Sequence, residues 1–123
     1  MTIQLTDAFV TLATVNLEKI TDFYRQLLGE KPRNYIPNVY AEFQLPEVKL
    51  GIFQPTQTHK AEFANSAQST MSLCLEVTDL EGAIAHLTTM GYPPPEEIST
   101  ASHGREIYAY DPDGNRIILH QSV

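Results

Sequence analysis

The sequence predicts an α+β fold in which one unit, a strand followed by a helix and further strands, occurs twice. Asn-Leu-Glu at residues 16–18 is matched by Asp-Leu-Glu at residues 79–81. A glycine suited to end a helix follows each of them, Gly29 in the first unit and Gly91 in the second. The run Asp-Pro-Asp-Gly-Asn at residues 111–115 is a strong turn signal near the C-terminus. A repeat of about sixty residues is typical of a duplicated structural unit.

In the first unit, residues 8–15 are rich in apolar and β-branched types, which predicts a strand. Asn16 is placed to cap a helix because its side-chain oxygen can accept a backbone N–H of the first turn. The runs at residues 38–45 and 48–53 predict two further strands. The helix is predicted by apolar residues at helical spacing: Leu17, Ile20, Phe23, Tyr24, Leu27 and Leu28.

The second unit repeats this order. Residues 72–77 predict a strand, and Asp79 is the corresponding helix cap. The runs at residues 106–110 and 116–120 alternate like two strands on either side of the turn signal. The second helix is predicted by another apolar stripe: Leu80, Ala83, Ile84 and Leu87.

These patterns describe a single domain of residues 1–123 with a first module at about 1–54 and a second at about 71–123. The residues between them, about 55–70, are polar and small. They predict a connecting loop, with a lid over a functional site as the alternative. His59 in this segment has no evident partner.

Charge and composition limit the classes of function. Eight Lys and Arg stand against fifteen Asp and Glu, a net charge of −7, which would repel nucleic acid and anionic membranes. The single cysteine excludes an internal disulfide and a cysteine-based zinc cluster. No signal peptide and no apolar run long enough to span a membrane are visible, so we expect a cytoplasmic protein.

Several segments carry a resemblance to a known family: residues 9–19, Phe-Tyr-Arg-Gln-Leu-Leu-Gly at 23–29, residues 75–80, and Tyr-Asp-Pro-Asp-Gly-Asn-Arg-Ile at 110–117. Together with the β-α-β-β-β order of each unit, they resemble the vicinal oxygen chelate superfamily. That family contains glyoxalase I, extradiol dioxygenases, fosfomycin-resistance enzymes and bleomycin-resistance binding proteins. The resemblance implies two curved half-barrel sheets with the helices on their convex faces, and a homodimer.

Alternation along the strands then predicts which side chains face the concave cavity. Tyrosines and phenylalanines there are typical of a site for an apolar or planar ligand, and a nearby carboxylate favours a cationic one. Filling of the cavity by these rings as core is the alternative. We expect the ligand site to be formed by Phe9, Thr11, Tyr40, Phe53, Ser72, Cys74, Glu76, His103, Glu106, Tyr108, Tyr110 and Ile118.

Enzymes of the family hold a divalent metal with His, Gln and Glu side chains, and the resemblance assigns those positions here. They fall on Phe9, on Lys49 or Gly51, on Ser72 and on Ile118. None of these is a credible metal ligand, and an apolar site does not compensate an ion for its lost hydration. We therefore expect no metal and no other cofactor.

Three further interpretations stay open at this point. A relocated metal site could draw on Glu76, Glu106 and His120. Cys74 is expected to be a small buried packing thiol rather than a nucleophile, because its neighbours offer nothing that lowers its pKa. Glu42 and Lys49 could pair across adjacent strands and neutralise each other.

The function that these observations favour is binding of a small organic molecule, cationic or aromatic, in a metal-free concave cavity, as in the bleomycin-resistance proteins. The first alternative is a metal-dependent lyase or dioxygenase of the glyoxalase or extradiol type. The second is a non-catalytic structural or regulatory dimer.

Overall fold

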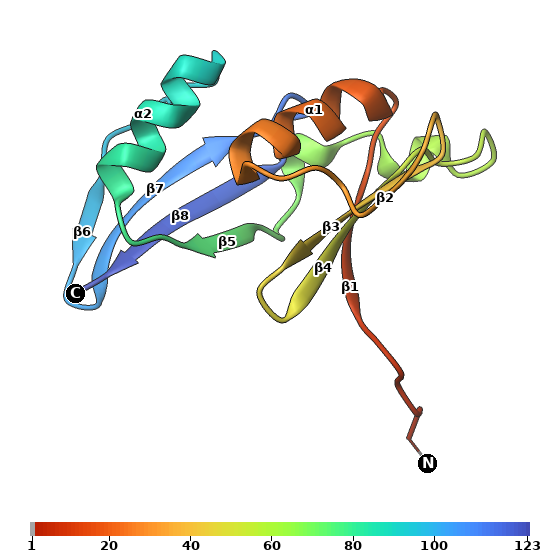
Figure 1. The fold of residues 1–123 in the computed structure, drawn as a ribbon, viewed down its shortest axis with the longest axis horizontal. Coiled ribbons are helices and arrows are strands. Elements are labelled where there is room, and N and C mark those ends of the chain that lie inside the picture. Colours follow the sequence, from red (N-terminus) through yellow and green to blue (C-terminus); the bar gives the residue numbers. More distant parts are fainter. Residues whose placement is uncertain (1) are drawn as a thin grey trace. The chain divides into compact units, whose positions relative to one another are not determined.

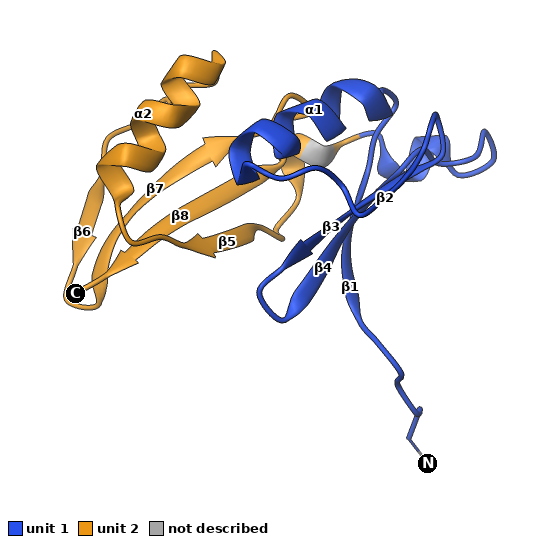
Figure 2. Ribbon diagram, in the orientation of Figure 1, with its two compact units in different colours: residues 1–64 blue, residues 65–123 orange. Residues whose placement is uncertain are grey.

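The computed structural model describes residues 2–123, and its elements follow the predicted order (Figure 1). The chain divides into two compact units, unit 1 up to residue 64 and unit 2 from residue 65 (Figure 2). Each unit consists of a strand, a helix and three more strands. The predicted α+β fold of two βαβββ modules is confirmed.

Unit 1 contains β1 (Phe9–Ala13), α1 (Leu17–Leu28), β2 (Asn34–Ile36), β3 (Tyr40–Leu45) and β4 (Val48–Phe53). Its sheet has the strand order β1-β4-β3-β2, with β1 parallel to β4 and the other pairs antiparallel. Two short 3-10 helices follow, η1 (Lys60–Phe63) in unit 1 and η2 (Ser66–Gln68) at the start of unit 2. The segment expected to be a plain connecting loop is therefore partly helical.

Unit 2 has the same plan, with β5 (Leu73–Glu76), α2 (Leu80–Met90), β6 (Ser99–Ala101), β7 (Gly104–Tyr110) and β8 (Arg116–Ser122). Its strand order, β5-β8-β7-β6, is that of unit 1, again with one parallel pair, β5 and β8. Among the strands, the short β2 and β6 were not predicted by any local run in the sequence.

The helix ends follow the predicted capping chemistry. The Asn16 side chain accepts a hydrogen bond from the Lys19 backbone N–H, and Asp79 accepts one from Gly82. Gly29 and Gly91 end the helices in the left-handed conformation, with φ of 70° and 93°. Residues with a Cβ rarely adopt this conformation, which is why glycine stands at both positions.

Each sheet buries one face against its own helix. In unit 1 the buried side chains of β3 and β4 are Ala41, Phe43, Leu45, Leu50 and Ile52. In unit 2, Ile107, Ala109, Ile117 and Leu119 are buried in the same way. Because side chains alternate along a strand, the residues between them lie on the opposite face of each sheet.

The β7–β8 turn is built around one buried side chain. The Asp111 carboxylate accepts hydrogen bonds from the backbone N–H groups of Asp113 and Asn115, at 2.9 and 3.0 Å, and from the Asn115 amide at 2.7 Å. The β3–β4 turn at Pro46 and Glu47 depends on backbone conformation instead, with Glu47 at a φ of 62°. Equivalent turns in the two units are thus stabilised in different ways.

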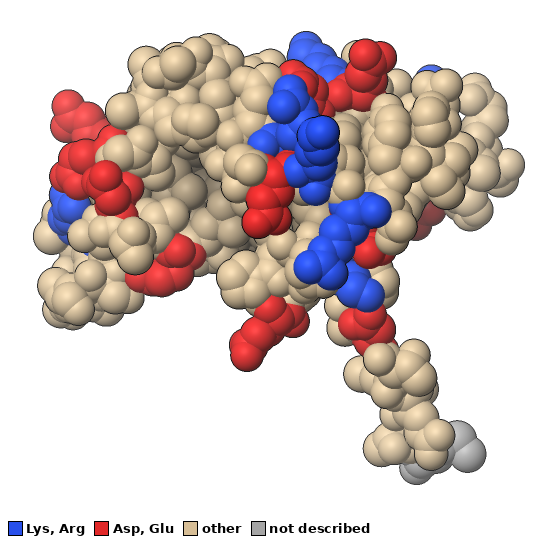
Figure 3. Space-filling view, in the orientation of Figure 1, with Lys and Arg blue, Asp and Glu red and all other residues tan. Residues whose placement is uncertain are grey.

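Charge is unevenly divided between the units. Unit 1 carries six Lys or Arg against seven Asp or Glu, whereas unit 2 carries two against eight. On the face drawn in Figure 3, the basic side chains gather mainly over unit 1. None of the helices among residues 2–123 is long and apolar enough to cross a membrane.

Candidate functional site

The face of the unit 1 sheet that points away from α1 carries the side chains predicted to face the cavity. We call it the open face of unit 1. Its residues form rows across the strands, because the register pairs Phe9 with Lys49, Thr11 with Gly51, and Tyr40 with Phe53. Phe9, Thr11, Tyr40 and Phe53, four of the predicted ligand-binding residues, therefore share this face.

A positively charged side chain lies beside Phe9, the first position that the resemblance assigns to a metal ligand. The Lys49 ammonium lies 4.8 Å from the centroid of the Phe9 ring and 2.7 Å from the Asp7 carboxylate. The hydrogen bond to Asp7 raises the pKa of Lys49, and the same bond lowers the pKa of Asp7. A charged ammonium beside an aromatic ring provides no ligand for a divalent cation and repels it.

The alternative position, Gly51, is covered by Tyr40. A Cβ at Gly51 would lie 2.7 Å from the Tyr40 hydroxyl oxygen. A residue with a side chain therefore does not fit at this position while Tyr40 stays in place. The hydroxyl donates a hydrogen bond to Glu42 at 3.0 Å. Burial and the Glu42 carboxylate raise the pKa of Tyr40 to about 12, so the phenol stays protonated and is a poor metal ligand.

Glu42 is nearly buried on this face, and sequence reasoning missed its partner Asn34. The Asn34 amide donates to the second Glu42 oxygen at 3.3 Å. The Glu42–Lys49 pair that the sequence left open is not formed across the strands, because the register places Glu42 opposite Gly51 and Lys49 opposite Gln44. The carboxylate is held instead by two neutral donors, Tyr40 and Asn34.

The corresponding face of the unit 2 sheet, which points away from α2, is the open face of unit 2. One row of the register joins Cys74, Ile118 and Tyr108, and the next joins Glu76, His120 and Glu106. On the other side of the Cys74 row, Tyr110 pairs with Arg116, and Ser72 lies beside Arg116. The predicted site residues of the second module are thus brought to one surface, with His103 in the turn between β6 and β7.

In unit 2 a positively charged side chain again contacts one of the assigned metal-ligand positions, Ser72. The Arg116 guanidinium donates to the Ser72 hydroxyl at 2.9 Å and to the Ser69 carbonyl oxygen at 3.2 Å. Ile118, the other assigned position, contributes only an apolar side chain. The donor set in unit 2 therefore does not fit a divalent metal any better than the set in unit 1.

Two histidines and two glutamates gather at the other end of the open face of unit 2. His120 Nδ1 lies 2.7 Å from Glu76, whose second oxygen accepts from the Ser122 backbone N–H at 2.7 Å. The His103 ring stacks on the His120 ring at 5.2 Å, and its Nε2 lies 4.0 Å from Glu106. Within residues 2–123, no three His, Cys, Asp or Glu side chains are grouped so that they could hold a metal ion.

Cys74 lies on the same face and is exposed. The expectation of a buried packing thiol is therefore wrong: alternation places the thiol on the open face, away from α2. Partial burial, followed by the negative charges of Glu76 and Glu106, raises the pKa of the Cys74 thiol. The thiol stays protonated near neutral pH, which argues against a role as a nucleophile.

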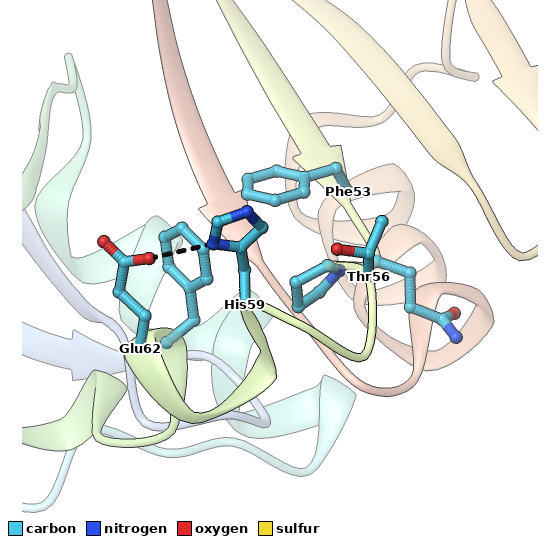
Figure 4. A pocket seen from close by; sticks show the side chains of 7 residues that line it. Phe53, Thr56, His59 and Glu62 are labelled. Carbon is cyan, nitrogen blue, oxygen red and sulfur yellow. Dashed lines mark ion pairs between the residues drawn. The ribbon is translucent and has the colours of Figure 1, made fainter.

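A pocket of about 390 Å³ opens beside the end of β4, within unit 1 (Figure 4). It lies in the segment expected to be a connecting loop, and apart from Phe53 its residues were not predicted. No periodicity marks such a site in the sequence, because the end of β4, the turn after it and η1 each contribute part of its wall. The residues that line it are Phe53, Gln54, Pro55, Thr56, His59, Glu62 and Phe63.

Comparison with known proteins identifies the family. The profile described as Glyoxalase/Bleomycin resistance protein/Dioxygenase superfamily matches residues 8–119 of this chain. Among curated proteins, no sequence matches it.

Solved structures with the same fold include a glyoxalase/bleomycin resistance protein from Catenulispora acidiphila, at 23% identity and a TM-score of 0.69, covering 95% of this chain and 98% of that one. A glyoxalase-related enzyme from Fulvimarina pelagi is 21% identical with a TM-score of 0.77, covering 96% and 89%. The fosfomycin resistance protein FosX from Listeria monocytogenes is 18% identical with a TM-score of 0.73, covering 100% and 96%. At these identities the structures show a shared fold, and with the profile match they establish that the chain belongs to the glyoxalase/bleomycin resistance protein/dioxygenase superfamily.

Proposed function

We propose that this chain binds a small organic molecule on the open faces of its units and does so without a divalent metal. The observation that carries the proposal is the chemistry of the four assigned metal positions. Phe9 and Ser72 are each contacted by a side-chain cation, Gly51 is covered by Tyr40, and Ile118 is apolar. A face of this kind lacks the ligands on which the metal enzymes of the family depend.

Aromatic and acidic side chains indicate the class of ligand. Tyr108 is 43% exposed on the open face of unit 2, where it shares a row with Cys74 and Ile118 and the next row carries the carboxylates of Glu76 and Glu106. Unit 2 also carries most of the excess negative charge of the chain. An exposed aromatic ring beside carboxylates favours a small organic cation or an aromatic compound through charge and cation–π attraction.

A thermal-shift screen tests the proposal. Small cationic, neutral and anionic aromatic compounds are added to the protein in the presence of a chelator, since a ligand that binds only the folded state raises the apparent Tm. We expect cationic or aromatic compounds to raise the Tm, and Tyr108→Leu to reduce that shift. Tyr35→Leu, which removes an exposed tyrosine of β2 outside the proposed site, is the matched control.

Two results would contradict this function. If no compound raises the Tm, the open faces are not a ligand site and a structural or regulatory role gains weight. If compounds bind only after a divalent metal is added, the protein works as the metal-dependent lyases and dioxygenases of its family do.

A homodimer and a cytoplasmic location complete the proposal, both carried over from the resemblance and from the sequence. Exposed apolar side chains on the strands, among them Phe9 and Tyr108, support the idea that a second chain covers part of these faces. Size-exclusion chromatography with light scattering should give twice the mass of the chain. A monomer at micromolar concentration would remove the dimer from the proposal.

A further inference from the structure

The pocket beside β4 is held by a short, well-defined segment of unit 1. The Gln54 backbone N–H donates to Val39 at 3.1 Å, which continues the pairing beyond β4. His59 then donates to the Thr56 carbonyl at 3.0 Å, and Glu62 donates to the His59 carbonyl at 3.1 Å. These bonds close two successive turns, so the pocket walls do not depend on side-chain contacts alone.

Two phenylalanines form the apolar walls. The Phe53 and Phe63 rings meet edge to face, with centroids 5.4 Å apart and planes at 89°. Phe63 is 42% exposed although it is a large apolar side chain. This contact anchors η1 to the end of β4, and Pro55 adds a third apolar surface to the pocket.

An acid–imidazole pair lies at the rim. His59 is the N-cap of η1, and the first turn of this 3-10 helix, closed by the hydrogen bond from Glu62 to His59, brings the two side chains together. His59 Nδ1 lies 3.4 Å from the Glu62 carboxylate, and Figure 4 shows the His59 ring beside Phe53 with Glu62 on its other side. Each side chain is about two-thirds exposed, so a ligand in the pocket can reach the carboxylate.

We propose that this pocket is a binding site for a small aromatic ammonium compound. The aromatic ring of the ligand packs against Phe53, Phe63 and Pro55, and its ammonium group lies near the Glu62 carboxylate. Two attractions then act on the same cation, the charge of Glu62 and the electron-rich face of a phenylalanine ring. A volume of about 390 Å³ is at the small end of the range for ligand pockets, which suits a compound with one ring.

The site goes beyond the proposed function, because it lies in the segment after β4 and shares only Phe53 with the open face of unit 1. Lys60 begins the same 3-10 helix but does not line the pocket. The segment between the modules is therefore assigned a binding role of its own rather than only a connecting one.

The probe for the test is benzyltrimethylammonium, titrated into the full chain labelled with ¹⁵N and followed by backbone NMR. Benzyl alcohol is the neutral control and tetramethylammonium the control that lacks a ring. We expect saturable shifts confined to residues 53–63, and weaker binding by both controls. Glu62→Gln and Phe63→Leu should each weaken benzyltrimethylammonium binding by about three- to tenfold.

Matched variants separate the pocket from general effects of charge and surface. Glu47→Gln removes an exposed carboxylate from the β3–β4 turn, and Tyr35→Leu removes an exposed ring from β2. Both should leave the affinity unchanged. Since the pocket residues are largely exposed, the spectra of Glu62→Gln and Phe63→Leu should also show that both variants stay folded.

Three outcomes would overturn the proposal: equal binding of benzyl alcohol, an unchanged affinity in Glu62→Gln, or shifts at the open faces instead of residues 53–63. In the last case the proposed function would still stand, because the cation would bind where Tyr108 lies. If the pocket binds the cation but the screen finds no ligand for the open faces, the proposed function fails and the pocket remains.

Discussion

Units 1 and 2 share one plan of elements but stabilise it with different side chains. Both helices begin at a capping Asn or Asp and end at a left-handed glycine, and both sheets have the same strand order. The cores differ. Helix α1 buries five residues, including Phe23 and Tyr24, whereas α2 buries only Leu80 and Leu87.

The open faces differ even more than the cores. Unit 1 has Lys49 over Phe9, and Tyr40 hydrogen-bonded to Glu42. In unit 2, Arg116 contacts Ser72 where unit 1 has Lys49 and Phe9, and His120 pairs with Glu76 where unit 1 has Phe53 and Ala13. Caps, turns and register therefore specify the fold in both units, while the face that can meet a ligand is specific to each.

The largest expected effect is loss of a core aromatic ring in unit 1. Phe43 is 1% exposed, and Phe43→Ala should lower the free energy of unfolding by about 3–5 kcal/mol, because it removes buried apolar surface and leaves a cavity. Leu119→Ala is the counterpart in unit 2, at 1% exposure, with an expected loss of about 2–5 kcal/mol. Urea denaturation measures both. A loss below 1 kcal/mol for Phe43→Ala would mean that unit 1 is not packed as described.

Removal of the turn carboxylate in unit 2 comes next. Asp111→Ala leaves two backbone donors and the Asn115 amide without their acceptor, with an expected loss of about 1–3 kcal/mol in the free energy of unfolding. The equivalent turn in unit 1 should respond in the opposite direction. Glu47→Gly should stabilise the protein by about 0.5–1 kcal/mol because glycine tolerates the positive φ. Equal destabilisation by both changes would show that the two turns are stabilised in the same way.

The helix caps should show a smaller difference between the units. Asn16→Ala and Asp79→Ala should each cost about 1 kcal/mol, since each removes one hydrogen bond to the first turn. The loss for Asp79 should be the larger of the two, because its negative charge also interacts with the helix dipole. Urea denaturation at low salt would detect the difference, and raising the salt concentration should reduce it.

The smallest expected effect is the pH dependence of stability that comes from an exposed ion pair in unit 2, Arg105 with Glu81. Two hydrogen bonds from the Arg105 guanidinium lower the pKa of Glu81 from 4.5 to about 2. The contribution of the pair to stability is therefore fully present above pH 4.5 and is lost as the pH falls towards 2. Glu81→Gln should remove part of this dependence in thermal unfolding between pH 5 and 2. A pH profile identical to that of the unchanged protein would contradict the pairing.

Local patterns in the sequence were sufficient to predict most of the fold. Capping residues, apolar stripes and the Asp111–Asn115 turn each act over a few positions, so their signals are readable without tertiary structure. Strands β2 and β6 are only three residues long and all six of their residues are exposed, so neither shows a periodic pattern. They form because an existing strand edge offers hydrogen bonds.

The candidate sites were only partly predictable. Alternation correctly separated the buried faces from the open ones, as Ile117 and Ile118 illustrate. The partners of the charged side chains depend on strand register and on distant segments, which is why Asp7 and not Glu42 binds Lys49. The pocket at Phe53 depends on a 3-10 turn that brings Phe63 back onto β4, and a polar segment of sequence gives no sign of that contact.

The central claim is that the open faces lack the donors to hold a divalent metal. The most direct measurement is the metal content of the protein, purified without a metal-binding tag and then dialysed against Mn²⁺, Ni²⁺ or Zn²⁺, together with its thermal stability. We expect well below one equivalent of metal per chain and no metal-dependent rise in Tm. Stoichiometric binding that raises the Tm, and that His120→Ala or Glu76→Gln abolishes, would contradict the claim and place the protein among the metal-dependent members of its family.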